Sequence, residues 1–79
     1  MKLKKAVAQR IKQILKEKNM TQYELSKKTG VPQSTISTIL NAETKTVKLS
    51  SLYDICVGLN IEFCDFFNCD YLKSYSLED

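Results

Sequence analysis

The stretch Thr21–Asn41, TQYELSKKTGVPQSTISTILN, contains two short helical patterns separated by a glycine. Thr21 is followed three residues later by Glu24, which fits a capping box, where each side chain satisfies a free backbone N–H at the start of a helix. Gly30 stands where this helix must end, because glycine adopts the left-handed conformation without a penalty at Cβ. The stretch therefore predicts a helix over about residues 22–29, followed by a turn.

The second pattern, Gln33–Asn41, has an apolar side and a polar side. At about 100° per residue, Ile36, Ile39 and Leu40 fall together on one side of a helix. The other side carries only uncharged hydrogen-bonding groups, on Gln33, Ser34, Ser37, Thr38 and Asn41. A helix with such a face can lie in the major groove of DNA and read the edges of the bases. The two patterns together predict a helix-turn-helix.

Several motifs at fixed spacing resemble the Cro/C1 (lambda-repressor-like, XRE-type) DNA-binding family: TQxEL from Thr21, GV from Gly30, QSTIS from Gln33, and Asn41. The stretch LYDICVGLNIEFCDFF, Leu52–Phe67, is similar to the family's fourth helix and its short fifth helix. The resemblance implies an all-α fold, a compact five-helix lambda-repressor-like domain over residues 1–67 with the helix-turn-helix at its second and third helices.

The resemblance also implies roles in DNA binding. Base reading falls to Gln33, Ser34, Ser37 and Thr38. Gln33 is the strongest candidate, because its amide can pair with adenine through two hydrogen bonds. Contacts to the DNA backbone fall to Arg10, Thr21, Gln22, Tyr23, Asn41, Lys45 and Thr46. Helix N-termini bind anions in general, which supports a phosphate at Gln22.

Some of these residues have an equally ordinary structural role. Arg10 can instead cover a seam between helices, and Tyr23 can be a half-buried surface ring. Asn41 can serve only as the cap of its helix. Two positions depart from the family pattern: Pro32 replaces a capping Ser or Thr, and Ala42 replaces a glycine.

The net charge of +3 conceals a strong asymmetry along the chain. Residues 1–48 carry eleven basic and three acidic side chains, a net +8, whereas residues 49–79 carry one basic and six acidic side chains, a net −5. Asymmetry of this kind indicates that one part of the molecule faces a polyanion. The basic half also holds the helix-turn-helix. DNA binding therefore explains its lysines better than solubility alone does.

Three further helical patterns flank the central stretch, over about residues 2–18, 50–59 and 62–67. Within the second of them, Leu52, Ile55, Cys56 and Leu59 form a stripe that we expect in the core. Asn60 stands where a left-handed glycine is usual. Part of the aromatic group in the third pattern should complete the core, and the remaining part is available to meet another subunit.

The last residues, 68–79, show no period, so their packing or role in dimerisation stays open. Tyr71, Leu72 and Tyr75 can pack on the domain or on a partner, with an unpacked terminus as the default expectation.

The composition disfavours an enzyme and a metal site. The chain has no histidine, which removes the commonest zinc ligand and the usual general base. Cys56, Cys64 and Cys69 have no recognised metal spacing and are expected to be reduced thiols. We expect no cofactor and no metal. No apolar run has secretory or membrane-spanning length, so we expect a cytoplasmic protein. The family resemblance implies that it comes from a bacterium or a phage.

The expected function is that of a sequence-specific regulator of transcription on double-stranded DNA, commonly a repressor in this family. Relatives usually act as homodimers on palindromic sites. The alternative is an antitoxin that binds its own operator and a toxin protein. A helix-turn-helix kept only for protein contacts is a third possibility, which the basic half disfavours.

Overall fold

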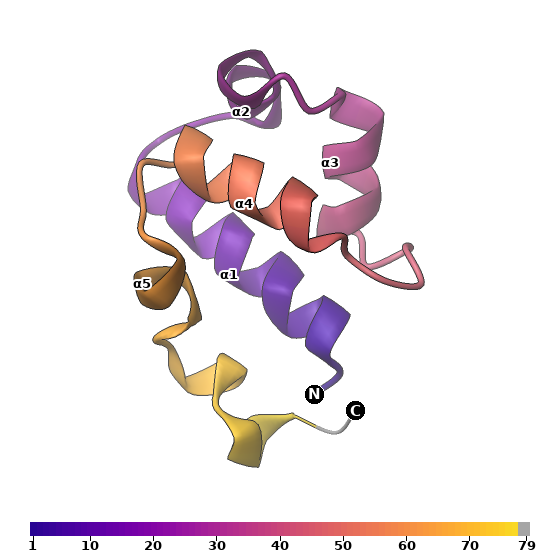
Figure 1. Cartoon of the computed structure of the whole chain (residues 1–79), viewed down its shortest axis with the longest axis vertical. Coiled ribbons are helices and arrows are strands. Elements are labelled where there is room, and N and C mark those ends of the chain that lie inside the picture. Colours follow the sequence, from indigo (N-terminus) through magenta and orange to yellow (C-terminus); the bar gives the residue numbers. More distant parts are fainter. Residues whose placement is uncertain (78–79) are drawn as a thin grey trace.

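The computed structural model of the protein describes residues 1–77, apart from the side chain of Tyr75. The regular secondary structure of this part of the chain is helical, without a strand (Figure 1). Its elements are α1 (Leu3–Glu17), α2 (Gln22–Thr29), α3 (Gln33–Leu40), α4 (Leu49–Gly58) and α5 (Phe63–Phe67), followed by the 3-10 turns η1 (Asp70–Leu72) and η2 (Ser74–Ser76). The expected all-α, five-helix fold is confirmed, with each predicted helix within two residues of its observed ends.

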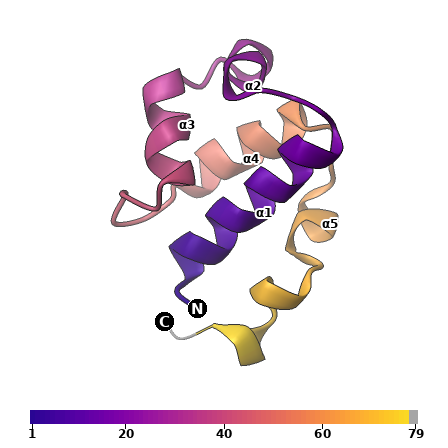
Figure 2. The same cartoon turned by 180° about the vertical axis from the view of Figure 1, so that it is seen from behind.

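The core lies between helices that pack in sequence: α1 against α3, α3 against α2, α2 against α4, and α4 against α5. Figure 1 shows α4 in front of α1, and Figure 2 shows the same pair from behind. Each α-helix contributes at least one side chain that is essentially inaccessible to solvent: Ile11, Leu25, Ile36, Ile55 and Phe66. Burial of apolar surface from all five helices in one cluster fixes α2 and α3 on the domain.

The start and end of α2 are set as its sequence predicts. The Glu24 backbone N–H donates to Thr21 Oγ1 at 3.1 Å, and the Thr21 backbone N–H donates to Glu24 Oε1 at 3.1 Å. Gly30 ends the helix with φ 78°, in the left-handed region. The capping box and the glycine turn are both confirmed, and they determine where α3 begins relative to α2.

Three other helices end on a left-handed residue that is not glycine. Asn19, Ala42 and Asn60 have φ values of 53°, 54° and 56°. Asparagine tolerates this conformation, as expected at Asn60, whereas alanine does so at a cost. Ala42 thus keeps the backbone path that a glycine would follow at the end of α3.

A close approach of α4 to α2 occurs at Gly58. A Cβ built there would lie 2.3 Å from Thr29 Cγ2 and 3.3 Å from Leu25 Cδ1. Thr29 is held in place because its hydroxyl donates to the Leu25 carbonyl at 2.9 Å and accepts from the Val31 N–H at 3.0 Å. Glycine at position 58 therefore lets α4 support the end of α2 and the turn into α3.

The segment after α5 packs against α1. Leu72 is 9 % exposed and joins the core, and the Tyr71 hydroxyl donates to the Gln13 side chain. The amino terminus of Met1 donates to the Ser76 carbonyl at 2.8 Å. The default expectation of an unpacked terminus is wrong for these residues. The Tyr75 side chain and residues 78–79 lie outside the described part of the chain.

Candidate nucleic-acid interface

The outer face of α3 presents the polar side chains that the sequence assigns to base reading. Ile36, Ile39 and Leu40 are buried, at 0 %, 4 % and 2 % exposure. On the other side of the helix, Gln33, Ser34 and Asn41 are exposed, and Ser37 and Thr38 are partly exposed. The helix begins at Gln33 although Pro32 makes no capping hydrogen bond, because proline's fixed φ suits the start of a helix. We call Gln33, Ser34, Ser37, Thr38 and Asn41 the reading face.

Hydrogen bonds within α3 decide which groups of the reading face remain available. Thr38 Oγ1 donates to the Ser34 carbonyl at 2.7 Å, so its oxygen is left mainly as an acceptor. Asn41 Nδ2 lies 3.4 Å from Ser37 Oγ and 3.5 Å from Glu43 Oε1, distances at which the bonds are weak. Within the described part of the chain, Gln33 and Ser34 make no side-chain hydrogen bond. Gln33 therefore has both its amide donor and its amide acceptor free for a base.

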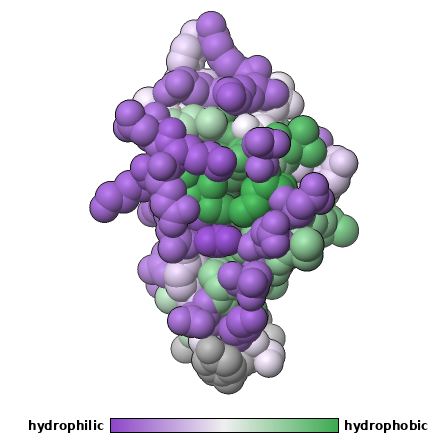
Figure 3. All heavy atoms as spheres, turned by 90° about the vertical axis from the view of Figure 1, so that its left-hand side faces the viewer, coloured by the Kyte–Doolittle hydropathy of each residue, from purple (hydrophilic) through white to green (hydrophobic). Residues whose placement is uncertain are grey.

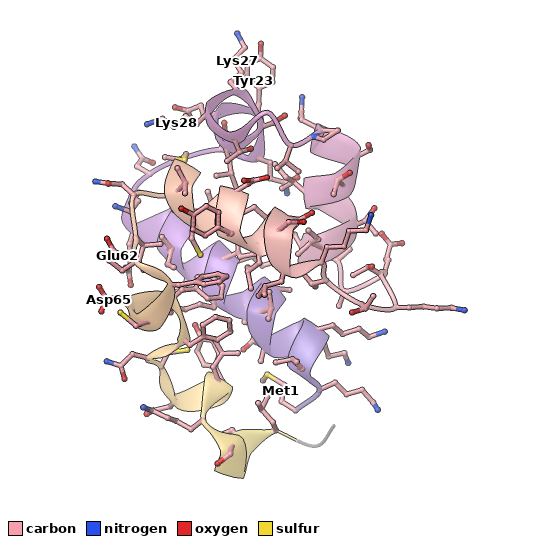
Figure 4. All side chains as sticks on the ribbon, viewed as in Figure 1. Met1, Tyr23, Lys27, Lys28, Glu62 and Asp65 are labelled. Atoms are coloured by element: carbon pink, nitrogen blue, oxygen red, sulfur yellow. The ribbon has the colours of Figure 1, made fainter. Side chains whose placement is uncertain are left out.

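The start of α2 exposes Thr21, Gln22 and Tyr23. The Thr21 hydroxyl is engaged in the capping box, where it also donates to Glu24 Oε1 at 3.1 Å. Tyr23 is 52 % exposed, and Lys27 Nζ lies 4.9 Å from the centre of its ring. Figure 4 shows Tyr23 and Lys27 together on the outside of α2, with Lys28 nearby. Two lysines and a helix N-terminus thus give α2 a surface that attracts anions.

The loop from α3 to α4 brings further polar groups beside the reading face. Thr46 is exposed and lines a hollow of about 540 Å³ together with Thr35 and Thr38 of α3. Lys45 is exposed too, and it lines a separate hollow with Lys2 and Lys4 at the start of α1. The sequence did not single out these two lysines, because their approach to Lys45 depends on how α1 packs.

Arg10 points away from the reading face, toward α5. Its Nε donates to the Phe66 carbonyl at 2.7 Å, one terminal nitrogen donates to the Asp65 carbonyl at 2.8 Å, and the other donates to Gln13 Oε1 at 2.9 Å. The guanidinium also lies 6.0 Å from the centre of the Phe66 ring. Of the two expected roles of Arg10, a phosphate contact or the covering of a seam between helices, these contacts support the second. Arg10 satisfies carbonyl groups at the end of α5.

Searches for a metal site and for a membrane-spanning helix found neither among the described residues. Across residues 1–77, no group of three His, Cys, Asp or Glu side chains is placed to hold a metal ion. None of the helices in this range combines the length and the apolar composition needed to cross a membrane.

The comparison with known families agrees with the geometry of the helix-turn-helix. Residues 10–71 match the Cro/C1-type HTH DNA-binding domain, a range that extends from α1 into η1. Neither a curated protein nor a solved structure matches the chain. On the extent of this match, together with the all-helical fold, the chain belongs to the family of Cro/C1-type helix-turn-helix DNA-binding domains.

Proposed function

We propose that this protein is a transcription regulator that binds a specific double-stranded DNA site by placing α3 in the major groove. The observation that carries the proposal is the exposed, uncharged reading face of α3, held outward by three buried apolar side chains. Amide and hydroxyl groups of this kind discriminate between base edges, whereas charged groups mainly bind phosphate. Gln33 is proposed as the principal base-reading residue because its amide is free.

The proposed contacts to the DNA backbone come from the elements on both sides of α3. Gln22 and Tyr23 at the start of α2, and Lys45 and Thr46 in the loop after α3, are exposed on elements that adjoin the reading helix. Thr21 is proposed to act through its backbone and the cap it forms, and Asn41 at the end of α3. Arg10 is proposed to support the domain rather than to touch DNA, because its guanidinium is already engaged.

The proposed mode of action is repression by a homodimer on a palindromic site. A two-fold dimer places two reading helices about one helical turn of DNA apart, which matches a palindrome. Occupation of successive major grooves excludes other proteins from the same site, so repression needs no further contact.

Selection of bound duplexes from a random pool with the purified protein tests the proposed function. The expected result is one enriched sequence made of two inverted half-sites, with centres about 10 bp apart. Enrichment should disappear when α3 is altered by Gln33→Ala combined with Ser34→Ala, both exposed positions that leave the core intact. Recovery of unenriched DNA by the unaltered protein would contradict sequence-specific binding.

A further inference from the structure

A hollow of about 470 Å³ is lined by the start of α1 and the start of α4, and we call it the α1–α4 hollow. Its volume lies within the range of small-molecule sites, roughly 300–1,000 Å³, which are mostly apolar and carry a few polar groups that orient the ligand. The apolar side chains that line it come from α1, the loop before α4, α4 itself and α5: Leu3, Val7, Val47, Leu49, Leu52 and Phe67.

The apolar walls of this hollow are open to solvent. Leu3, Leu49 and Phe67 are 43 %, 68 % and 36 % exposed, and they are three of the six large hydrophobic side chains that are exposed in the described chain. Val7 and Leu52 line the hollow from the buried core. On the side of the molecule where α5 lies, apolar surface is enclosed by hydrophilic groups (Figure 3). A ligand with an apolar chain would therefore displace water from these walls when it binds.

Three lysines border the apolar walls. Lys2 and Lys4 come from the start of α1, and Lys45 comes from the loop after α3. Among the described residues that line the hollow, none is acidic. Within the same part of the chain, none of the three ammonium groups makes a side-chain hydrogen bond or an ion pair. Positive charges around one hollow favour an anion over a neutral or a cationic ligand.

The larger hollow beside α3 lacks this combination of charge and apolar surface. Hydroxyl side chains make up much of its lining, together with one lysine, Lys48, and one aspartate, Asp54. Opposite charges beside hydroxyl groups select no single class of ligand, so only the α1–α4 hollow carries the inference below.

We propose that the α1–α4 hollow binds a small amphiphilic anion, a free carboxylate with one unbranched alkyl chain. The chain packs against Leu3, Leu49 and Phe67, and the carboxylate meets the lysine ammonium groups at the edge of the hollow. An inorganic anion would leave the apolar walls in water, and a neutral hydrocarbon would leave the lysines without a partner. A ligand that carries both an alkyl chain and a negative charge satisfies both parts of the hollow.

A carboxylate bound in the hollow competes with DNA for Lys45, which is one of the proposed contacts to the DNA backbone. Each lysine withdrawn from a phosphate weakens DNA binding. Occupation of the hollow should therefore favour release of the protein from DNA, and DNA should weaken carboxylate binding by the same factor. This competition rests on the proposed function, whereas binding of the carboxylate itself does not.

Titration of the full chain with decanoate in the absence of DNA, followed by NMR of the methyl groups, tests the site. Decanoate is kept below the concentration at which it forms micelles. The largest shift changes should occur at the methyl groups of Leu3 and Leu49, whereas those of Leu25 and Leu59, buried elsewhere in the core, should not move. Decylammonium, which carries the opposite charge on a similar chain, should not bind.

The length of the alkyl chain tests the apolar contact. Affinity should rise on the order of tenfold from hexanoate to octanoate, and again from octanoate to decanoate, because each buried methylene group raises affinity about fourfold. Leu49→Glu should abolish decanoate binding, since it places a negative charge in the apolar wall. Val57→Glu, on the same helix and 60 % exposed but outside the hollow, is the matched control and should bind as tightly as the unaltered chain.

The lysines are tested by removing their charge. Lys2→Gln with Lys4→Gln should weaken decanoate binding by about tenfold, because charge-assisted contacts to the carboxylate are lost. Lys12→Gln with Lys16→Gln, two exposed lysines of α1 outside the hollow, is the control and should not weaken it. Circular dichroism establishes that every variant is folded.

Three results would overturn the site. They are no binding of decanoate to the unaltered chain, equal binding by the Leu49→Glu and Val57→Glu chains, and binding to vesicles of anionic phospholipid without binding of monomeric decanoate. The third result would assign the hollow to a membrane surface instead of a free carboxylate.

A measurement with DNA separates this inference from the proposed function. Saturating decanoate should weaken binding of the unaltered chain to random duplex DNA by about threefold or more, and the effect should be smaller in the Lys45→Gln chain. Duplex affinity that decanoate leaves unchanged would overturn the competition for Lys45. If the chain binds no DNA, the proposed function fails, and decanoate binding measured without DNA still decides whether the hollow is a ligand site.

Discussion

Helices α3 and α4 have similar buried faces and opposite outer faces. Each buries three apolar side chains within its span: Ile36, Ile39 and Leu40 in α3, and Leu52, Ile55 and Cys56 in α4. The outer face of α3 carries amides and hydroxyls, whereas the outer face of α4 carries three large apolar side chains, Leu49, Tyr53 and Val57, beside Ser50 and Asp54. The buried faces account for the fold. The outer faces differ in their chemistry, and we propose that the outer face of α3 meets DNA.

The largest expected effect is a loss of stability when the buried face of α3 or of α4 is altered. Ile36→Ala and Ile55→Ala should each lower the free energy of unfolding by about 2–5 kcal/mol, because both side chains are fully buried and their removal leaves a cavity. Urea unfolding followed by circular dichroism measures the change. Ser34→Ala and Ser50→Ala, on the outer faces, are the matched controls and should stay within about 0.5 kcal/mol of the unaltered chain. A loss of less than about 1 kcal/mol at either isoleucine would mean that the two buried faces are not equivalent.

The buried faces differ in one group, the thiol of Cys56. Burial raises the pKa of Cys56 from 9.0 to about 11, and the charge of Arg10 acts weakly in the opposite direction. Between these values the unfolded chain loses the thiol proton and the folded chain keeps it. Stability that is present below pH 9 should therefore fall as pH rises toward 11, by on the order of 2 kcal/mol in total.

Unfolding measured from pH 8 to pH 11 for the unaltered chain and for Cys56→Ala isolates the thiol, since lysines and tyrosines titrate in both. The alanine variant should lose less stability over this range. Equal slopes would show that the Cys56 thiol titrates alike in the folded and unfolded chains.

A smaller loss of stability is expected where α4 packs closely against α2, at Gly58. Gly58→Ala should lower stability by about 1–2 kcal/mol, because the new Cβ meets the fixed Cγ2 of Thr29 and overpacking outweighs the better helix propensity of alanine. Thr29→Ser removes Cγ2 and keeps the hydroxyl. Combining the two changes should therefore recover most of the loss in thermal unfolding. Additive losses in the double variant would place the strain elsewhere.

A substitution at the end of α3 should have the smallest effect, and it should increase stability. Ala42→Gly should raise stability by about 0.5–1 kcal/mol, because φ 54° is strained for alanine and unstrained for glycine. Asn60→Gly at the end of α4 is the comparison and should gain less, since asparagine already tolerates this conformation. Thermal unfolding distinguishes the two, and a loss at position 42 would show that the Ala42 methyl group makes a stabilising contact.

Local signals in the sequence were sufficient to predict the helices but not the contacts between distant segments. The bounds of α2 agree with prediction because a capping box and a glycine fix both ends within one turn. Helix α4 begins at Leu49, one residue before the predicted range, because no side-chain cap marks its start. The sequence does not distinguish the two roles of Arg10, since its partners in α5 lie 55 and 56 residues away in the chain.

The packing of the C-terminal segment could not be predicted for a related reason. Leu72 sits in a single 3-10 turn, which is too short to give a periodic pattern, and its burial depends on α1 at the other end of the sequence. The reading face is different: it follows from the periodicity of α3 alone, because the side chains that hold it outward belong to the same helix.

The central claim is that α3 reads DNA bases through Gln33, and the most direct test compares two exposed glutamines. Gln33→Ala should weaken binding to the selected duplex by about 5- to 150-fold, the loss of one good base contact, and should leave binding to random duplex unchanged. Gln9→Ala, on α1, should change neither affinity. Equal weakening of both duplexes by Gln33→Ala, or no weakening of the selected one, would contradict base reading by Gln33.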